Sequence, residues 1–241
     1  RKLGNLRVVS AQQLARWRTK QAPAYQPLAG HTASEQEQSI RTEMVQKLRR
    51  GCEHALLFGA SGVCSARVDA HSFLITPEGM DNALLEEDDP VLERGDSAEA
   101  GKQPANESEL HASIYTQHAE IRAVFSAAPA NVAAFASAKE RFETSTVPES
   151  YYMLRAVPTR TMEDFLGDPA ANAACFSEKT PVVLFENSRL VTTGASLFTA
   201  LDRLEVAEAT AASILVAREA GKVIFLSEEE IQALKTTFHL E

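Results

Sequence analysis

The chain has 241 residues, and its content of 44% hydrophobic and 24% charged residues is typical of a globular domain. No apolar run approaches the roughly 18 residues that a membrane-spanning helix needs, so the sequence predicts no membrane span. The formal net charge is −9, and the length suits one domain, or one domain with an appendage.

The charge is unevenly distributed along the chain. Residues 1–34 contain no acid and six basic residues, which leaves 18 basic against 33 acidic residues in the remainder. The six cations are Arg1, Lys2, Arg7, Arg16, Arg18 and Lys20. This segment resembles an organelle transit peptide. Other interpretations are a solvated tail, an arm that docks on an acidic surface such as another copy of this chain, and, less favoured, an arm that binds nucleic acid. We divide the chain into a basic N-terminal arm and linker, residues 1–34, and a domain, residues 35–241.

The three cysteines, Cys52, Cys64 and Cys175, lie far apart and form no C-x-x-C pair. This spacing predicts free thiols rather than a disulfide framework. We therefore expect an intracellular, reducing compartment, either cytoplasmic or organellar, with the mitochondrion as one possibility.

The first half of the chain predicts two helices around a pair of strands. After a short helical pattern at 10–20 and a Pro/Gly linker at 21–30, the domain begins near Thr32. An apolar stripe at i, i+4 spacing predicts a helix within 32–57. Two strands follow at 59–68 and 72–76, and then a long acidic loop with a short strand near Val91. A capping box formed by Asn106 and Glu109 predicts the start of a helix within 107–118.

The second half alternates strands with helices. Strands are predicted at 121–125, 151–159, 180–187 and 189–193, and helices at 129–141, 168–175, from Ser196 to about 215, and at 227–237. Ser227 and Glu230 form the capping box of the last helix. The mixture implies a sheet with helices on both faces.

The junction between the strand at 121–125 and the helix that Pro129 opens has no reactive side chain. Junctions of this kind carry the chemistry in many α/β folds, yet this one offers only Ser126, Ala127 and Ala128. The question is whether these residues are a spacer or a site that has lost its contents.

Four segments in order resemble the class II aldolase/adducin family. They are the glycine-rich turn and strands of 59–80, the helix start of 102–115, the strand end of 123–129, and the segment 184–200 with its long helix. The resemblance covers roughly residues 37–220. It implies a three-layer α/β/α domain with a central, largely antiparallel sheet.

The resemblance also implies a zinc site that this sequence lacks. Enzymes of the family hold zinc with three imidazoles, two from His-x-His and one from Asn-His-Gly. Those positions carry Ser126, Ala128 and Ser188 here, and Arg189 stands at the glycine of the motif. Hydroxyl and methyl groups do not replace three nitrogen ligands, so we expect no metal and no other cofactor.

The positions that cradle phosphate in the family have changed as well. They carry Val63, Glu78, Ala105 and Asn106 in this chain. Glu78 adds negative charge where a phosphate would lie, and Coulomb repulsion at a few ångströms opposes phosphate binding there.

Glu107 matches the acid/base glutamate of the family, and His111 matches its helical histidine. Both also have structural explanations, because carboxylates are favoured in a first helical turn and His111, one turn later, can pair with Glu107. His111 and His118 share one helix face, whereas His54 and His71 lie elsewhere in the sequence. Neither Cys64 nor Cys175 has an adjacent histidine, and no Walker or Rossmann glycine motif is present.

These observations favour a non-catalytic class II aldolase-like domain that acts as a structural or interaction subunit of an oligomer or a larger assembly. Adducin is a precedent within the family. One alternative is a lyase, of aldolase or decarboxylase type, that acts on a small carbonyl or sugar-phosphate substrate with an altered site around Glu107. A second alternative is a small-molecule binding domain. The resemblance implies a homo-oligomer, and specifically a tetramer.

Overall fold

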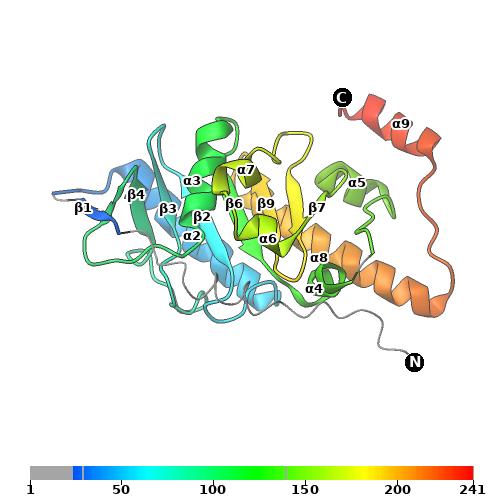
Figure 1. Ribbon diagram of the computed structural model, residues 1–241, viewed down its shortest axis with the longest axis horizontal. Coiled ribbons are helices and arrows are strands. Elements are labelled where there is room, and N and C mark those ends of the chain that lie inside the picture. The colour runs from blue at the N-terminus through cyan, green and yellow to red at the C-terminus, as the bar shows by residue number, and fades with distance from the viewer. Residues whose placement is uncertain (1–23, 29, 139, 241) are drawn as a thin grey trace.

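A computed structural model describes residues 24–28, 30–138 and 140–240, and Figure 1 shows the arrangement of their helices and strands. The predicted helix at 10–20 and most of the basic arm lie outside these residues. Within the described part of the chain, no helix is long and apolar enough to cross a membrane.

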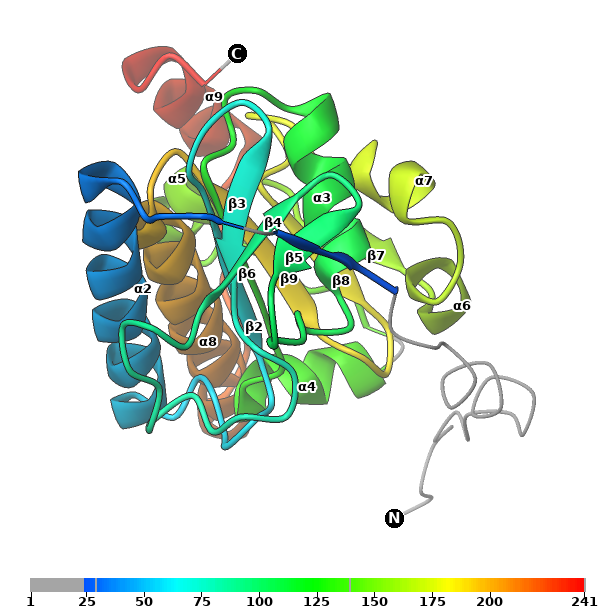
Figure 2. The same cartoon turned by 90° about the vertical axis from the view of Figure 1, so that its left-hand side faces the viewer.

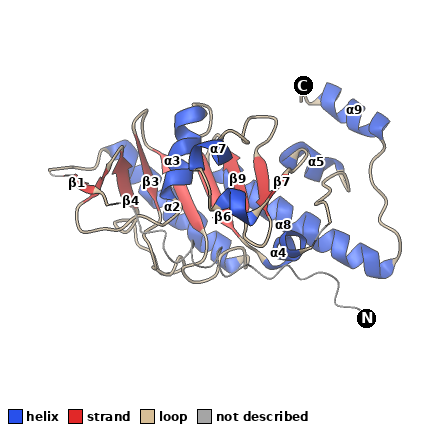
Figure 3. Cartoon of the chain, viewed as in Figure 1, coloured by secondary structure: helices blue, strands red, loops and turns tan. Residues whose placement is uncertain are grey.

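A single sheet in the order β1-β5-β4-β3-β2-β6-β9-β8-β7 forms the centre of the molecule (Figure 3). Its described strands are β1 (Gln26–Leu28), β2 (Val63–Arg67), β3 (Ser72–Ile75), β4 (Val91–Arg94), β5 (Ser97–Glu99), β6 (Ala123–Ala127), β7 (Thr159–Arg160), β8 (Val182–Phe185) and β9 (Leu190–Gly194). Only the outermost pairs, β1 with β5 and β7 with β8, are parallel. The prediction of a largely antiparallel sheet is confirmed.

Helices cover both faces of this sheet. The described helices are α2 (Glu35–Glu53), α3 (Ser108–Gln117), α4 (Ala130–Ser137), α5 (Pro148–Leu154), α6 (Met162–Phe165), α7 (Pro169–Ala173), α8 (Leu197–Ala220) and α9 (Glu228–Thr237), of which α9 packs on α5 away from the sheet. Figure 2 shows α2 and α8 on one face and α3, α6 and α7 on the other. Each face has its own apolar core, as the three-layer prediction requires.

The alternation of side chains along β6 separates the two cores. Ala123, Phe125 and Ala127 belong to the core under α2 and α8, whereas Val124 belongs to the core under α3. Because successive residues of a strand point to opposite faces, Ser126 lies on the α3 face with Val124.

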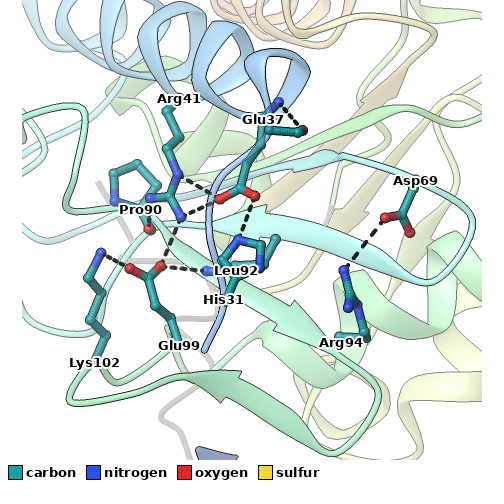
Figure 4. Close-up of polar contacts among 10 residues, drawn as sticks. His31, Glu37, Arg41, Asp69, Pro90, Leu92, Arg94, Glu99 and Lys102 are labelled. Carbon is teal, nitrogen blue, oxygen red and sulfur yellow. Dashed lines mark hydrogen bonds and ion pairs between the residues drawn. The ribbon is translucent and has the colours of Figure 1, made fainter. Parts of the chain in front are cut away.

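The helix α2 lies within the predicted range of 32–57 and is anchored by charge as well as by apolar contacts. Ser34 caps it by accepting a hydrogen bond from the Glu37 backbone N–H at 3.2 Å. The buried Arg41 guanidinium pairs with Glu37 at 2.7 Å and with Glu99 of β5 at 2.8 Å (Figure 4). His31 contacts the same Glu37 carboxylate at 2.7 Å. This network ties the segment before α2 to the edge of the sheet.

Two predictions of local structure are wrong. Residues 26–28 form strand β1, so the sheet begins within the segment predicted as a linker. Residues 148–154, which overlap the predicted strand at 151–159, form helix α5. Pro148 is favoured at the first turn of a helix, and α5 packs on α8, so tertiary contacts outweigh the aromatic and apolar content that favours a strand.

Other predictions of local structure agree with the fold. Ser196 caps α8 through the Thr199 backbone N–H at 3.1 Å, and the capping box of Ser227 and Glu230 opens α9. The prediction of free thiols is confirmed at Cys52, Cys64 and Cys175.

Candidate functional site

The end of β6 and the turn between β8 and β9 lie side by side at one end of the sheet. The register pairs Ser126 with Val191 and Ala127 with Leu190, so Ala128 and Arg189 follow at the same strand ends. Ser188 is the next residue in the β8–β9 turn. The three positions that resemble lost zinc ligands therefore gather at one end of two neighbouring strands.

Glu107 reaches this place from the start of α3. It occupies the N-cap position of the helix, and its side chain makes no capping hydrogen bond. The carboxylate turns instead toward β6, where its Oε2 atom accepts a short hydrogen bond from the hydroxyl of the fully buried Ser126. The candidate acid/base residue is thus held against the strand end.

The predicted capping box of Asn106 and Glu109 is wrong. Helix α3 begins at Ser108 rather than after Asn106. The Asn106 side chain is engaged elsewhere, because its Nδ2 atom donates to Glu78 at 2.8 Å. A partner from another part of the chain outweighs the local capping pattern.

Arg189 supplies the positive charge of the site. Its Nη1 atom donates a short hydrogen bond to the Oε1 atom of Glu107, and its guanidinium lies 5.3 Å from the centre of the Phe165 ring. Burial lowers the pKa of Arg189 to about 10, so the side chain stays protonated at neutral pH. Its Nε atom is buried and has no hydrogen-bond partner among the described residues. That N–H is thus an unsatisfied donor within the described structure.

A cavity of about 560 Å³ opens beside this ion pair. The glycine-rich turn, the start of α3 and the α6–α7 segment line it, through Gly62, Glu107, Phe165, Pro169 and Arg189 among others. Its volume is in the range of small-molecule sites. The cavity can hold a small ligand against a carboxylate and a guanidinium.

Three of the four positions that resemble the phosphate cradle also line this cavity: Val63, Glu78 and Asn106. The Glu78 carboxylate already accepts hydrogen bonds from the donors of Asn106. The two oxygens of its carboxylate accept from the Asn106 backbone N–H at 2.9 Å and from the Asn106 side chain at 2.8 Å. Val63 lines the same cavity, and Ala105 is buried behind it. A carboxylate of the chain itself therefore takes the donors that an anionic ligand would use.

His111 does not pair with Glu107 through its side chain. Its Nδ1 atom lies 2.7 Å from the Ser65 hydroxyl, which is also 2.7 Å from the Tyr115 hydroxyl. Complete burial lowers the pKa of His111 to about 3, so the imidazole is neutral. The suggestion of a His111–Glu107 pair is wrong because α3 turns His111 toward β2.

The other histidines lie apart from the site. The His118 Nε2 atom is 2.9 Å from the Ala173 carbonyl oxygen, and His54 contacts Glu205 at the end of α2. His71 lies in the β2–β3 turn. Among the described residues, no group of three or more His, Cys, Asp or Glu side chains is arranged to hold a metal ion.

The residues at this site do not fit the zinc that the fold family implies. The side chains at the three ligand positions are hydroxyls and a methyl, and a guanidinium is paired with the carboxylate beside them. A second cation next to Arg189 would meet like charge without nitrogen or sulfur ligands to compensate. Whether purified protein contains zinc remains a prediction for measurement.

Sequence reasoning missed two features of the site. Arg189 was noted only as a replaced glycine, although it is the partner of Glu107. The contribution of Phe165 from α6 has no sequence signal, because the α6–α7 segment reaches the site through long-range packing of α7 on α3 and of Phe165 on Phe185 of β8.

Comparisons with known proteins identify the family of this chain. The sequence profile described as Class II Aldolase and Adducin N-terminal domain matches residues 42–215. A curated relative, the 3-oxo-tetronate 4-phosphate decarboxylase of Haemophilus influenzae, is 24% identical over 202 residues, which cover 80% of this chain and 94% of the relative.

Solved structures share the fold. An L-fuculose 1-phosphate aldolase has a TM-score of 0.72 at 22% identity, and the match covers 88% of this chain and 100% of that one. A sugar-phosphate aldolase from Thermotoga maritima has a TM-score of 0.69 at 18% identity, with 78% and 98% covered. The family and the fold expected from the sequence are confirmed: the chain belongs to the class II aldolase and adducin N-terminal domain family.

Proposed function

We propose that this protein is a lyase of the decarboxylase or aldolase type that acts on a small carbonyl acid in the cavity beside Glu107. The observation that carries the proposal is the ion pair of the Glu107 carboxylate and the Arg189 guanidinium in the lining of that cavity, with the buried Ser126 hydroxyl holding the carboxylate. The relatives named above are lyases, which supports this alternative over the structural role that the sequence favoured.

Decarboxylation of a 3-oxo acid is the reaction that suits these groups best. The bond between the carboxylate and the adjacent carbon breaks, CO2 leaves, and the electron pair is delocalised onto the ketone oxygen as an enolate. The Arg189 guanidinium, which lines the cavity, can donate to that oxygen as charge develops. One proton from solvent, relayed by Glu107, then completes the product. This route needs a hydrogen-bond donor to the ketone oxygen and a group that relays a proton. Arg189 can fill the first role and Glu107 the second.

The substrate that fits this cavity carries no phosphate at the position of Glu78. The donors of Asn106 are already used by that carboxylate, and a phosphate there would face it directly. We therefore propose an unphosphorylated 3-oxo acid, whereas the relative from Haemophilus influenzae is named for a 4-phosphate.

Steady-state CO2 release from unphosphorylated 3-oxo acids of four to six carbons tests the proposal. We expect turnover that falls at least about 100-fold in Glu107→Gln and in Arg189→Met, since each variant removes a group that acts only on developing charge. The matched control is Arg141→Met, which changes an arginine whose side chain is exposed and does not line this cavity. Turnover that is absent from the unmodified protein, or unchanged in both variants, would reject the lyase proposal.

A second candidate is the non-catalytic subunit that the sequence favoured. The observation in its favour is that Arg189 and Ser126 together satisfy both oxygens of Glu107 without any ligand. On this proposal the chain acts as a homo-oligomer, a tetramer by family resemblance, or within a larger assembly. A well-defined native mass with no turnover and no ligand binding supports this candidate, and ligand binding without turnover supports a small-molecule binding domain.

A further inference from the structure

A second cavity, of about 440 Å³, lies between the β4–β5 turn and the helices α3 and α7. Four carboxylates line it, from Glu93, Asp96, Glu109 and Asp168. Within the described part of the chain, no lysine or arginine is among its lining residues. The described lining of this cavity is therefore acidic.

Glu93 is the most deeply placed of these acids, with only 2% of its surface exposed. Its Oε2 atom accepts from the Ser108 hydroxyl at 2.9 Å, whereas its Oε1 atom has no hydrogen-bond partner in the described structure. Burial raises the pKa of Glu93 to about 7, against the opposing effect of the Ser108 and Tyr25 hydroxyls. A buried carboxyl oxygen without a donor is costly, and it marks a place for a donor from outside the walls.

The described N-terminal residues of the chain run along this cavity. Ala24 and Tyr25 line it, the Tyr25 hydroxyl makes a short hydrogen bond with Ser108, and the Gln26 backbone N–H donates to the Asp96 carbonyl oxygen at 2.9 Å. The first described residue, Ala24, therefore lies in the lining of the acidic cavity.

We infer that the acidic cavity takes a guanidinium or ammonium group supplied by residues 1–23 of the same chain. All six cations of the N-terminal segment precede Ala24, and the nearest, Lys20, is five residues before Tyr25. Five residues extend over about 17 Å at most, and the lysine side chain adds reach, so a cation of this segment can enter the cavity. A cationic group would give the Oε1 atom of Glu93 a hydrogen-bond donor and would bring positive charge into an acidic cavity.

The acidic cavity lies next to the proposed catalytic site. The docking of the arm does not depend on any activity at that site. Ser108, which donates to Glu93, follows Glu107 in the chain, and Pro169 lines both cavities. The inference goes beyond the proposed function, and it stands or falls on the position of the arm alone.

The chain offers a direct probe, because Trp17 is its single tryptophan and lies within the segment in question. Fluorescence anisotropy of Trp17 in the full-length protein should be high at low salt and should fall by at least about a third in Glu93→Gln. It should fall equally when Arg16, Arg18 and Lys20 are all changed to Gln. Glu149→Gln, which removes an exposed acid from the first turn of α5, is the matched control and should have no effect.

Asp168→Asn keeps the inference testable if Glu93→Gln fails to fold. Asp168 caps α7 by accepting from the Ala170 backbone N–H at 2.9 Å, and asparagine retains that cap while removing the charge. Unchanged Trp17 anisotropy in both variants would overturn the inference. Loss of the high anisotropy on dilution would also overturn it, because the cation would then come from a second copy of the chain. Binding of ethylguanidinium that leaves the Trp17 anisotropy unchanged would overturn it as well, because the cavity would then be a site for a free ligand.

Discussion

Arg189 donates from Nη1 to the Oε1 atom of Glu107, and this contact joins the β8–β9 turn to the start of α3. Ser126 donates to the other oxygen of the same carboxylate. The ion pair is mostly buried, with 22% of the Arg189 side chain and 12% of the Glu107 side chain exposed. It gives the site a fixed carboxylate and a fixed cation at the place where the family resemblance puts a metal.

The first prediction concerns the stability that this pair contributes. Arg189→Met should lower the free energy of unfolding by about 2–4 kcal/mol, because it leaves a largely buried carboxylate with one donor fewer. Urea unfolding followed by circular dichroism measures the change. Arg141→Met, at a side chain that is 69% exposed, should change it by less than about 0.5 kcal/mol. Equal effects of the two substitutions would contradict the structural importance of the pair.

The second prediction concerns pH and rests on His111, whose folded pKa of about 3 lies below its ordinary value of 6.5. Between these values the unfolded chain binds a proton that the folded protein does not, so stability should fall as pH drops from 6.5 toward 3. The full effect is roughly 5 kcal/mol. The free energy of unfolding is measured across this pH range for the wild type and for His111→Gln. The difference between the two separates the effect of the imidazole from that of the carboxylates, which titrate in the same range. A difference that does not depend on pH would refute the assignment.

The third prediction concerns phosphate. Glu78→Ser removes the carboxylate that accepts both donors of Asn106, and it should raise the affinity for inorganic phosphate at least about tenfold. Isothermal titration calorimetry compares the variant with the wild type. The control is Glu78→Gln, which removes the charge but keeps an oxygen acceptor and should give a smaller gain. Wild-type affinity equal to that of the serine variant would show that Glu78 does not exclude phosphate.

The fourth prediction concerns zinc. Metal analysis of purified protein should find substoichiometric zinc, and chelators should leave the melting temperature unchanged, since a bound metal would stabilise the native state. Changing Ser126, Ala128 and Ser188 to histidine, together with Arg189→Gly, should create zinc binding that a chelator reverses. One tightly held zinc in each wild-type chain would overturn the reading of these positions.

Much of the architecture could be predicted because strong local signals agree with the packing. The stripe of Met44 and Leu48 on α2 and the Ser196 cap of α8 are decided by residues close in sequence. Strand β1 and helix α5 could not be predicted in the same way. The first forms only by pairing with β5, and the second packs on α8, which comes later in the chain.

The residues of the site can be divided in the same way, into those that local motifs identify and those that only folding brings together. The positions of Ser126, Ala128 and Ser188 follow from aligned motifs on neighbouring strands, so sequence could identify them. The partner of Glu107 could not be identified, because Arg189 comes from a turn 82 residues later in the chain and its motif has a glycine there. Likewise, Glu78 meets Asn106 only through folding, which removed the local capping box that the sequence suggested.

The account depends most directly on whether the site works without a metal through Arg189. The decisive measurement is the rate of CO2 release from an unphosphorylated 3-oxo acid by chelator-treated, full-length protein, before and after addition of zinc. We predict that the treated protein retains the full rate and that zinc leaves it unchanged, while Arg189→Met lowers it at least about 100-fold. A rate that is lost on chelation and restored by zinc would contradict the account.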